Sequence, residues 1–218
     1  MRVADGEAMN SKSSSRLLFG LAALAAAGFA ATTVAVARGM TSKLDQRAKR
    51  RLHETRDKSD RAGALRTGAL ATTPLGKWWG YAPPSLWTAL RLQRRGRTAG
   101  AATIAATTVL AALLPPLLDR SLRRRLPPPE RGEPDEQSFP SGHALQSSAM
   151  ALTTGYVLYR EGLGPRWTSA PLGLASLLTG AGRLLLDRHW SSDVVGGYLA
   201  GLALGGTTAG VYELARAR

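Results

Sequence analysis

Two short polar stretches hold the side chains best suited to chemistry, and each lies at the end of an apolar run. The first begins at Ser138, ends at His143 and reads SFPSGH. Its proline, serine and glycine predict a turn, with Ser141 as the N-cap of the helix that follows. A helix N-terminus presents free backbone N–H groups to an anion, and a histidine there can donate a proton to a departing oxygen. The alternative is a capped helix start with an incidental histidine.

The second stretch begins at Arg183 and ends at Asp193. His189 and Asp193 are four residues apart, so on a helix they would share a face. A carboxylate beside one ring nitrogen fixes the tautomer and strengthens the other nitrogen as a base or nucleophile. Arg183 offers a planar guanidinium suited to phosphate oxygens. The alternative is an ion pair at a membrane boundary, which the neighbouring Asp187 and Arg188 fit better.

Composition limits the remaining chemistry. The chain has 218 residues and no cysteine, which excludes disulfides, thiolate metal sites and a cysteine nucleophile. It has 3 histidines, so a histidine-rich metal centre is not expected. The net charge of +14 would suit nucleic acid, but no reader motif or interleaved aromatic pattern supports that partner, and no nucleic acid is expected.

Charges alternate with long uncharged segments, and this alternation divides the chain. The predicted parts are a disordered N-terminal tail over residues 1–16, a first transmembrane helix over 17–37, a basic linker or helix over 38–66, and the main domain over 67–218. The 17–37 segment could span a bilayer core of about 30 Å, although a secretory signal peptide is the competing interpretation. The basic segment reads as a solvated helix or linker, or as a helix that contacts anionic lipid headgroups.

Further apolar runs in the main domain predict an all-α, polytopic membrane bundle of five or six transmembrane helices. These runs cover residues 98–118, 144–159, 167–182 and 194–212. Residues 67–90 are ambiguous, because Lys77 and several prolines and aromatic residues interrupt the apolar pattern and favour the headgroup interface. Abundant glycine and alanine permit close helix approach in a membrane.

Together the two polar stretches resemble the type 2 phosphatidic acid phosphatase (PAP2) superfamily, which also contains bacterial acid phosphatases, glucose-6-phosphatase and vanadium haloperoxidases. The family pattern is Lys-x6-Arg-Pro, then Pro-Ser-Gly-His, then Ser-Arg-x5-His-x3-Asp. Residues 140–143 match the second part in full. Arg183, His189 and Asp193 match the third, with Gly182 in place of the serine. The resemblance implies a PAP2/haloperoxidase-like helical core and a phosphatase that acts on lipid phosphates.

The first part of the family pattern is degraded in this chain. It should lie within residues 119–128, but neither Asp119 nor Arg120 in the lysine position is followed by Arg-Pro at the right spacing. The arginines over residues 123–125 lie nearby and could supply the missing charge from shifted positions.

The resemblance also implies a role for each matched residue. His189 would be the nucleophile that takes the phosphoryl group, and Asp193 would orient and polarise it. His143 would be the general acid for the leaving group and then the base that activates water. The groups expected to hold the phosphoryl oxygens are Arg120, Arg125, Ser141, the Gly142 backbone amide and Arg183. The phosphatases of the family need no metal, so neither a metal nor another cofactor is expected.

The expected partners are a lipid phosphate and the bilayer of a bacterial cell membrane. Phosphatidic acid, a polyprenyl diphosphate and phosphatidylglycerol phosphate all qualify, and the sequence separates neither these substrates nor the oligomeric states. If residues 67–90 do not cross the membrane, the basic block over 43–66 lies opposite the site. The positive-inside bias then favours an extracytoplasmic site, which is the preferred reading; a crossing segment weakens or reverses the bias.

Two alternatives to a hydrolase stay open at the level of sequence. A phosphotransferase would use the same phosphohistidine with an alcohol acceptor instead of water. A non-enzymatic membrane protein would have kept the fold and lost turnover, and the degraded first motif is its support.

Overall fold

The computed structural model describes residues 2–57, 62–118, 124, 127 and 138–217. Every regular element in these residues is helical, which confirms the all-α expectation. The α-helices are α1 (Arg2–Ala37), α2 (Ser42–Asp57), α3 (Ala62–Thr72), α4 (Trp78–Arg94), α5 (Thr98–Leu118), α6 (Gly142–Arg160), α7 (Ser169–Leu185) and α8 (Ser191–Arg216). Two short 3-10 helices, η1 (Thr73–Gly76) and η2 (Arg166–Thr168), precede α4 and α7.

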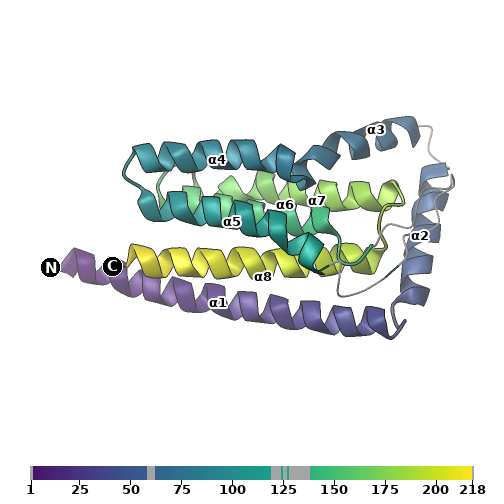
Figure 1. Cartoon of the computed structure of the whole chain (residues 1–218), viewed down its shortest axis with the longest axis horizontal. Coiled ribbons are helices and arrows are strands. Elements are labelled where there is room, and N and C mark those ends of the chain that lie inside the picture. The colour runs from purple at the N-terminus through teal and green to yellow at the C-terminus, as the bar shows by residue number, and fades with distance from the viewer. Residues whose placement is uncertain (1, 58–61, 119–123, 125–126, 128–137, 218) are drawn as a thin grey trace.

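Six of the helices, α1 and α4 to α8, run side by side as one bundle, and α2 crosses one end of it (Figure 1). Both chain termini lie at the opposite end (Figure 1). Three stretches in the described part of the chain are long and apolar enough to cross a membrane by themselves: Ser11–Ala37, Thr98–Leu118 and Ser191–Arg216. The chain therefore forms an integral membrane bundle.

The ambiguous segment over residues 67–90 enters the bundle instead of staying at the headgroup level. Its second half forms α4, which runs alongside α5 (Figure 1). The buried residues of α4 are Tyr81, Ser85, Ala89 and Leu92, whose spacing of three or four places them on one helix face. Trp79 and Trp87 are exposed and lie outside that face, and Trp78 is exposed at the start of the helix. As a result, α2 and its basic residues lie at the end of the bundle where α6 and α8 begin, which is called the α2 end below (Figure 1).

The N-terminal tail also differs from its predicted disorder. Helix α1 begins at Arg2 and includes the residues assigned to the tail. Ser11 and Ser15 are 4% and 3% exposed, and Ser11 Oγ accepts a hydrogen bond of 3.3 Å from Arg160. Before the apolar run, the helix therefore packs against the bundle at Ser11 and Ser15.

Close contact between α6 and α8 places the two chemical stretches next to each other. Glycines on α8 face α6, and a methyl group added at Gly201 would overlap the Leu145 carbonyl and the Ser148 hydroxyl. Without side chains at these positions the two helix backbones approach closely, as small residues allow in membrane bundles.

We expect Gly201→Leu to disrupt the bundle, because overpacking a well-packed contact typically costs about 1–3 kcal/mol. The measurement is the thermal midpoint and the monodisperse yield of detergent-solubilised protein. Gly173→Leu on α7 is the matched control, since an added Cβ there meets nothing within 4 Å. Equal losses in both variants would contradict the inferred contact.

Candidate active site

The two polar stretches meet at the α2 end through backbone hydrogen bonds. The Ser141 N–H donates to the Asp193 carbonyl oxygen at 3.0 Å. His189 Nδ1 lies 2.8 Å from the Ser138 carbonyl oxygen, which can only accept, so Nδ1 carries the proton. The structure thus brings His143, His189 and Asp193 to one place from the start of α6, the loop before α8 and the first turn of α8.

His189 is held through Nδ1, which leaves Nε2 as the nitrogen with a free lone pair. Burial and, next in size, the positive charge of Arg183 together lower the pKa of His189 to about 3. The imidazole is therefore neutral at neutral pH. A neutral imidazole of fixed tautomer can act as a nucleophile.

Asp193 contacts His189 less directly than the sequence predicted. Helix α8 begins at Ser191, so His189 precedes the helix and does not share a helical face with Asp193. Its Nδ1 lies 3.9 Å from Asp193 Oδ2, and that oxygen instead accepts a hydrogen bond of 2.7 Å from the Trp190 N–H. The direct partner of the ring is a backbone carbonyl, and Asp193 supplies a negative charge beside it.

Arg124 is a second partner of Asp193. Its Nη1 donates a hydrogen bond to Asp193 Oδ1. The sequence analysis named Arg120 and Arg125 as phosphate ligands, and both lie outside the described residues. The sequence did hold a signal for Arg124, because six residues separate it from Arg131, as six separate the lysine and arginine of the family's first motif.

His143 lies on the first turn of α6 and is buried, with Nε2 lacking a hydrogen-bond partner among the residues that the structure describes. A Cβ added at Gly76 would lie 2.7 Å from the His143 Cβ, so η1 packs directly against this side chain. A buried imidazole nitrogen without a hydrogen-bond partner destabilises the folded protein unless a ligand supplies that partner.

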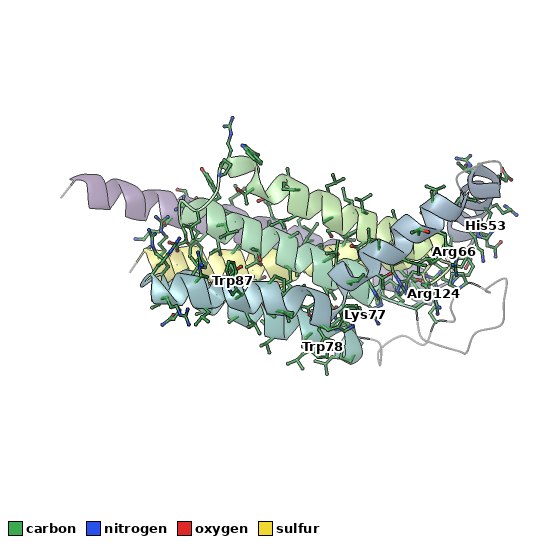
Figure 2. All side chains as sticks on the ribbon, turned by 90° about the horizontal axis from the view of Figure 1, so that it is seen from above. His53, Arg66, Lys77, Trp78, Trp87 and Arg124 are labelled. Atoms are coloured by element: carbon green, nitrogen blue, oxygen red, sulfur yellow. The ribbon has the colours of Figure 1, made fainter. Side chains whose placement is uncertain are left out.

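Two cations act on both histidines. The charges of Arg183, at the end of α7, and of Lys77, at the start of α4, each interact with His143 and His189. In Figure 2, Lys77 and Arg124 lie at the α2 end of the bundle, towards His53 of α2. Sequence reasoning missed Lys77, because a lysine beside two tryptophans also fits the headgroup interface. Its neighbour Gly76 was the available signal, since a glycine there permits close approach to His143.

The remaining predicted ligands lie at the same helix start. Ser141 is the N-cap of α6, and its Oγ accepts a hydrogen bond of 3.5 Å from the Ala144 N–H. Gly142 follows, and its Cα backs onto Pro115 of α5, since an added Cβ would lie 3.2 Å from the Pro115 Cβ. The first-turn amides of α6 therefore lie beside His143, where a helix N-terminus can bind an anion.

No group of three or more metal-binding side chains occurs within the described ranges of the chain. The arrangement there consists of two imidazoles, a carboxylate, the three cations Lys77, Arg124 and Arg183, and a helix N-terminus. Such a set can bind a phosphate group, attack it and protonate a leaving oxygen.

Comparisons with known proteins agree with this arrangement. The sequence pattern of the PAP2 superfamily matches residues 62–216. The fold is similar to a crystal structure described as the first transmembrane PAP2 type phosphatidylglycerolphosphate phosphatase from Bacillus subtilis, with a TM-score of 0.74 and 20% sequence identity. That match covers 88% of this chain and 95% of the other. No curated protein matches the sequence.

Acidic conditions should destabilise the folded protein through His189. Its pKa in the fold lies below the ordinary value of 6.5, so the unfolded chain takes up a proton that the folded chain resists. This contribution to stability is complete above pH 6.5 and is lost as the pH falls towards about 3. We expect the thermal midpoint to fall between about pH 7 and about pH 5 by more in the unchanged protein than in His189→Gln, whose side chain does not titrate. Equal falls would contradict a neutral, buried His189.

Proposed function

The chain belongs to the PAP2 superfamily, and on this premise we propose that it is a membrane phosphatase that removes a phosphate group from a lipid. The observation that carries the proposal is the pair of histidines, of which His143 is buried and His189 has a side chain that is 10% exposed. His189 has its Nδ1 proton committed to a carbonyl, and His143 has a buried Nε2 with no hydrogen-bond partner among the described residues. His189 Nε2 is thus suited to act as a nucleophile, and His143 Nε2 is suited to donate a proton.

In the first half of the proposed reaction, His189 Nε2 attacks the phosphorus of the substrate. An N–P bond forms, and the P–O bond to the lipid breaks. His143 donates its proton to the departing oxygen, which leaves as an alcohol or, from a diphosphate, as a lipid monophosphate. The phosphorylated ring carries a positive charge, which the Asp193 carboxylate stabilises across 3.9 Å while the Ser138 carbonyl holds the Nδ1 proton.

In the second half, His143 accepts a proton from a water molecule as that water attacks phosphorus. The N–P bond breaks, the bonding electrons return to Nε2, and inorganic phosphate leaves. Both histidines are then back in their starting states. The cycle needs no group beyond the side chains and water.

Positive charge for the phosphate comes from Arg183 and Lys77, with the first-turn amides of α6 as further donors. Because these groups are fixed in place before the substrate arrives, they stabilise the charge that develops on the phosphoryl oxygens. Arg120 and Arg125 stay proposed ligands from the sequence.

A groove beside the site supports a lipid as the substrate. It has a volume of about 410 Å³ and lies between α4, α6 and α7, with largely apolar walls that include Tyr81, Met150, Ala151 and Leu172. Ser147, one turn after His143 on α6, also lines it, so the groove begins next to the catalytic histidine. A phosphate at the histidines would leave an attached chain free to follow the groove.

The place of α2 removes one argument for the membrane side of the site. The sequence-based preference for an extracytoplasmic site required the basic block to lie at the opposite end of the bundle. Since α2 lies at the site end, that argument no longer supports the preference (Figure 1). The exposed Lys43, Arg47, Arg50 and Arg51 add positive charge at the α2 end, while Arg91, Arg94 and Arg95 add it at the opposite end, so the positive-inside bias assigns the site to neither side of the membrane.

The phosphohistidine is tested with purified, detergent-solubilised protein and a panel of phosphatidic acid, a polyprenyl diphosphate and phosphatidylglycerol phosphate, without added metal. We expect phosphate release and an acid-labile phosphoenzyme, and we expect His189→Ala to abolish both. His143→Ala should slow release from basic leaving groups far more than from acidic ones, because a general acid matters most for a basic leaving oxygen. Full activity per folded molecule in His189→Ala would exclude the proposed reaction.

The groove is tested by filling it. Ala151→Phe should lower kcat/KM for long-chain phosphatidic acid at least about tenfold, while hydrolysis of a short water-soluble phosphate ester should change less than about threefold. Ala106→Phe is the control, because Ala106 is exposed on the outer face of α5. The same loss with both substrates would mean that the variant harms the site and not the fit of a chain.

A further inference from the structure

Helix α2 contributes a buried acid to the site, although it precedes the segment that the family pattern matches. The helix is strongly basic, and Lys43, Arg47 and Arg50 are exposed. Asp45 is the exception, with an exposed fraction of 2%. A buried carboxylate on an otherwise solvated helix needs a specific set of partners.

Among the residues that the structure describes, the Asp45 carboxylate accepts four hydrogen bonds, all from Arg124 and the first turn of α8. Its Oδ1 accepts from Ser191 Oγ at 2.6 Å and from the Ser192 N–H at 2.9 Å. Its Oδ2 accepts from Ser192 Oγ at 2.8 Å and from Arg124 Nη2 at 2.7 Å. Both serines belong to the first turn of α8, so Asp45 places a negative charge at the N-terminus of the helix that carries Asp193.

Arg124 connects this carboxylate to the catalytic one. Its Nη2 binds Asp45, while its Nη1 binds Asp193 Oδ1 and also Ser192 Oγ at 2.7 Å. The guanidinium is thus shared between two buried carboxylates, and it lies over the Trp190 ring with 5.7 Å between Cζ and the ring centroid. A planar guanidinium whose two Nη atoms each bind a carboxylate is fixed in one orientation.

We propose that Asp45 is a positioning residue of the active site, which holds Arg124 and the first turn of α8 so that Asp193 keeps its place beside His189. This inference rests on the proposed phosphatase function. Asp45 acts through Arg124 and does not touch the substrate. The unit that performs the chemistry therefore includes α2 and is longer than the segment shared with the family.

Two further observations tie α2 to the site. Asp187, in the loop before α8, accepts a hydrogen bond of 3.0 Å from His53 Nε2, and its Oδ1 lies 3.3 Å from Lys49 Nζ. Helix α2 therefore contacts this loop at a second point. A small cavity of about 60 Å³ between α2 and this loop has both Asp45 and His189 in its walls.

Burial by itself raises the pKa of Asp45, but the hydrogen bonds from Ser191, Arg124 and Ser192 outweigh it and hold the pKa below its ordinary value. The group is therefore a carboxylate when it binds Arg124.

Asp45→Asn in the full chain separates the bonds of Asp45 to the first turn of α8 from its bond to Arg124. The amide oxygen can still accept from Ser191 and the Ser192 N–H, but the amide nitrogen faces Arg124 as a second donor. We expect kcat for phosphatidic acid to fall at least about tenfold, with KM within about threefold and a thermal midpoint within about 3 °C of the unchanged protein. Glu54→Gln, the same chemical change at an exposed position of α2, should leave all three values unchanged.

A double-mutant cycle tests whether Asp45 acts through Arg124. In an Arg124→Gln background, Asp45→Asn should lower kcat by less than about a further twofold, because the partner is already gone. Independent, additive losses would overturn the proposal, and so would wild-type kcat in Asp45→Asn.

A second variant covers the case in which Asp45→Asn does not fold. Arg124→Lys keeps the charge, but a single ammonium cannot bind both carboxylates in the fork geometry. We expect its kcat to fall at least about tenfold at an unchanged thermal midpoint, and wild-type kcat would overturn the proposal. Absence of phosphate release from the unchanged chain would instead overturn the proposed function and, with it, this inference.

Discussion

The hydrogen bond from the Ser141 N–H to the Asp193 carbonyl joins the two helix starts on which the site is built. It sets the distance between the first turn of α6, which carries His143, and the first turn of α8, which carries Asp193. The bond from His189 to the Ser138 carbonyl then adds the second histidine to the same unit. These contacts form only because glycines of α8 let its backbone approach α6 closely. A shift of one helix by a single turn would separate the two imidazoles.

Charge at both ends of the bundle is paired inside the protein. At the α2 end, Arg124 lies between Asp45 and Asp193. At the opposite end, the buried Glu213 accepts hydrogen bonds from Tyr156 at 2.7 Å and from Arg160 at 2.9 Å. Buried charges are costly unless they are paired and hydrogen-bonded, and the cost is higher where apolar surroundings replace water. The pairing fixes the ends of the helices, and at the α2 end it also sets the field in which the histidines act.

The residues of the site come from three parts of the fold: helices α6 to α8, helix α4 and helix α2. The histidines and Asp193 come from α6, α8 and the loop between α7 and α8, and Arg183 comes from α7. Lys77 and the lipid groove come from the side of α4, and Asp45 comes from α2 across the end. Groups from separate elements, held by their own hydrogen bonds, are preorganised for a charged transition state. This arrangement also explains how the site can be assembled without the Arg-Pro pair of the family's first motif.

The sequence by itself determined the helices and the reactive residues, because both have local signatures. Uncharged runs predicted the spanning helices, the SFPSGH stretch predicted the Ser141 cap, and the spacing around His189 pointed to the proposed nucleophile and its carboxylate. It did not determine that residues 78–90 would pack in the bundle or that residues 11–16 would be helical, since both depend on burial against neighbouring helices.

Only the tertiary structure decided which charges meet. Asp45 and Arg124 lie far apart in sequence, and no local pattern pairs them. Lys77 reaches the histidines because η1 packs against His143, and no periodicity records that contact. The acceptor for His189 is the backbone carbonyl of Ser138, and since every residue has a carbonyl, its position in space is what selects it.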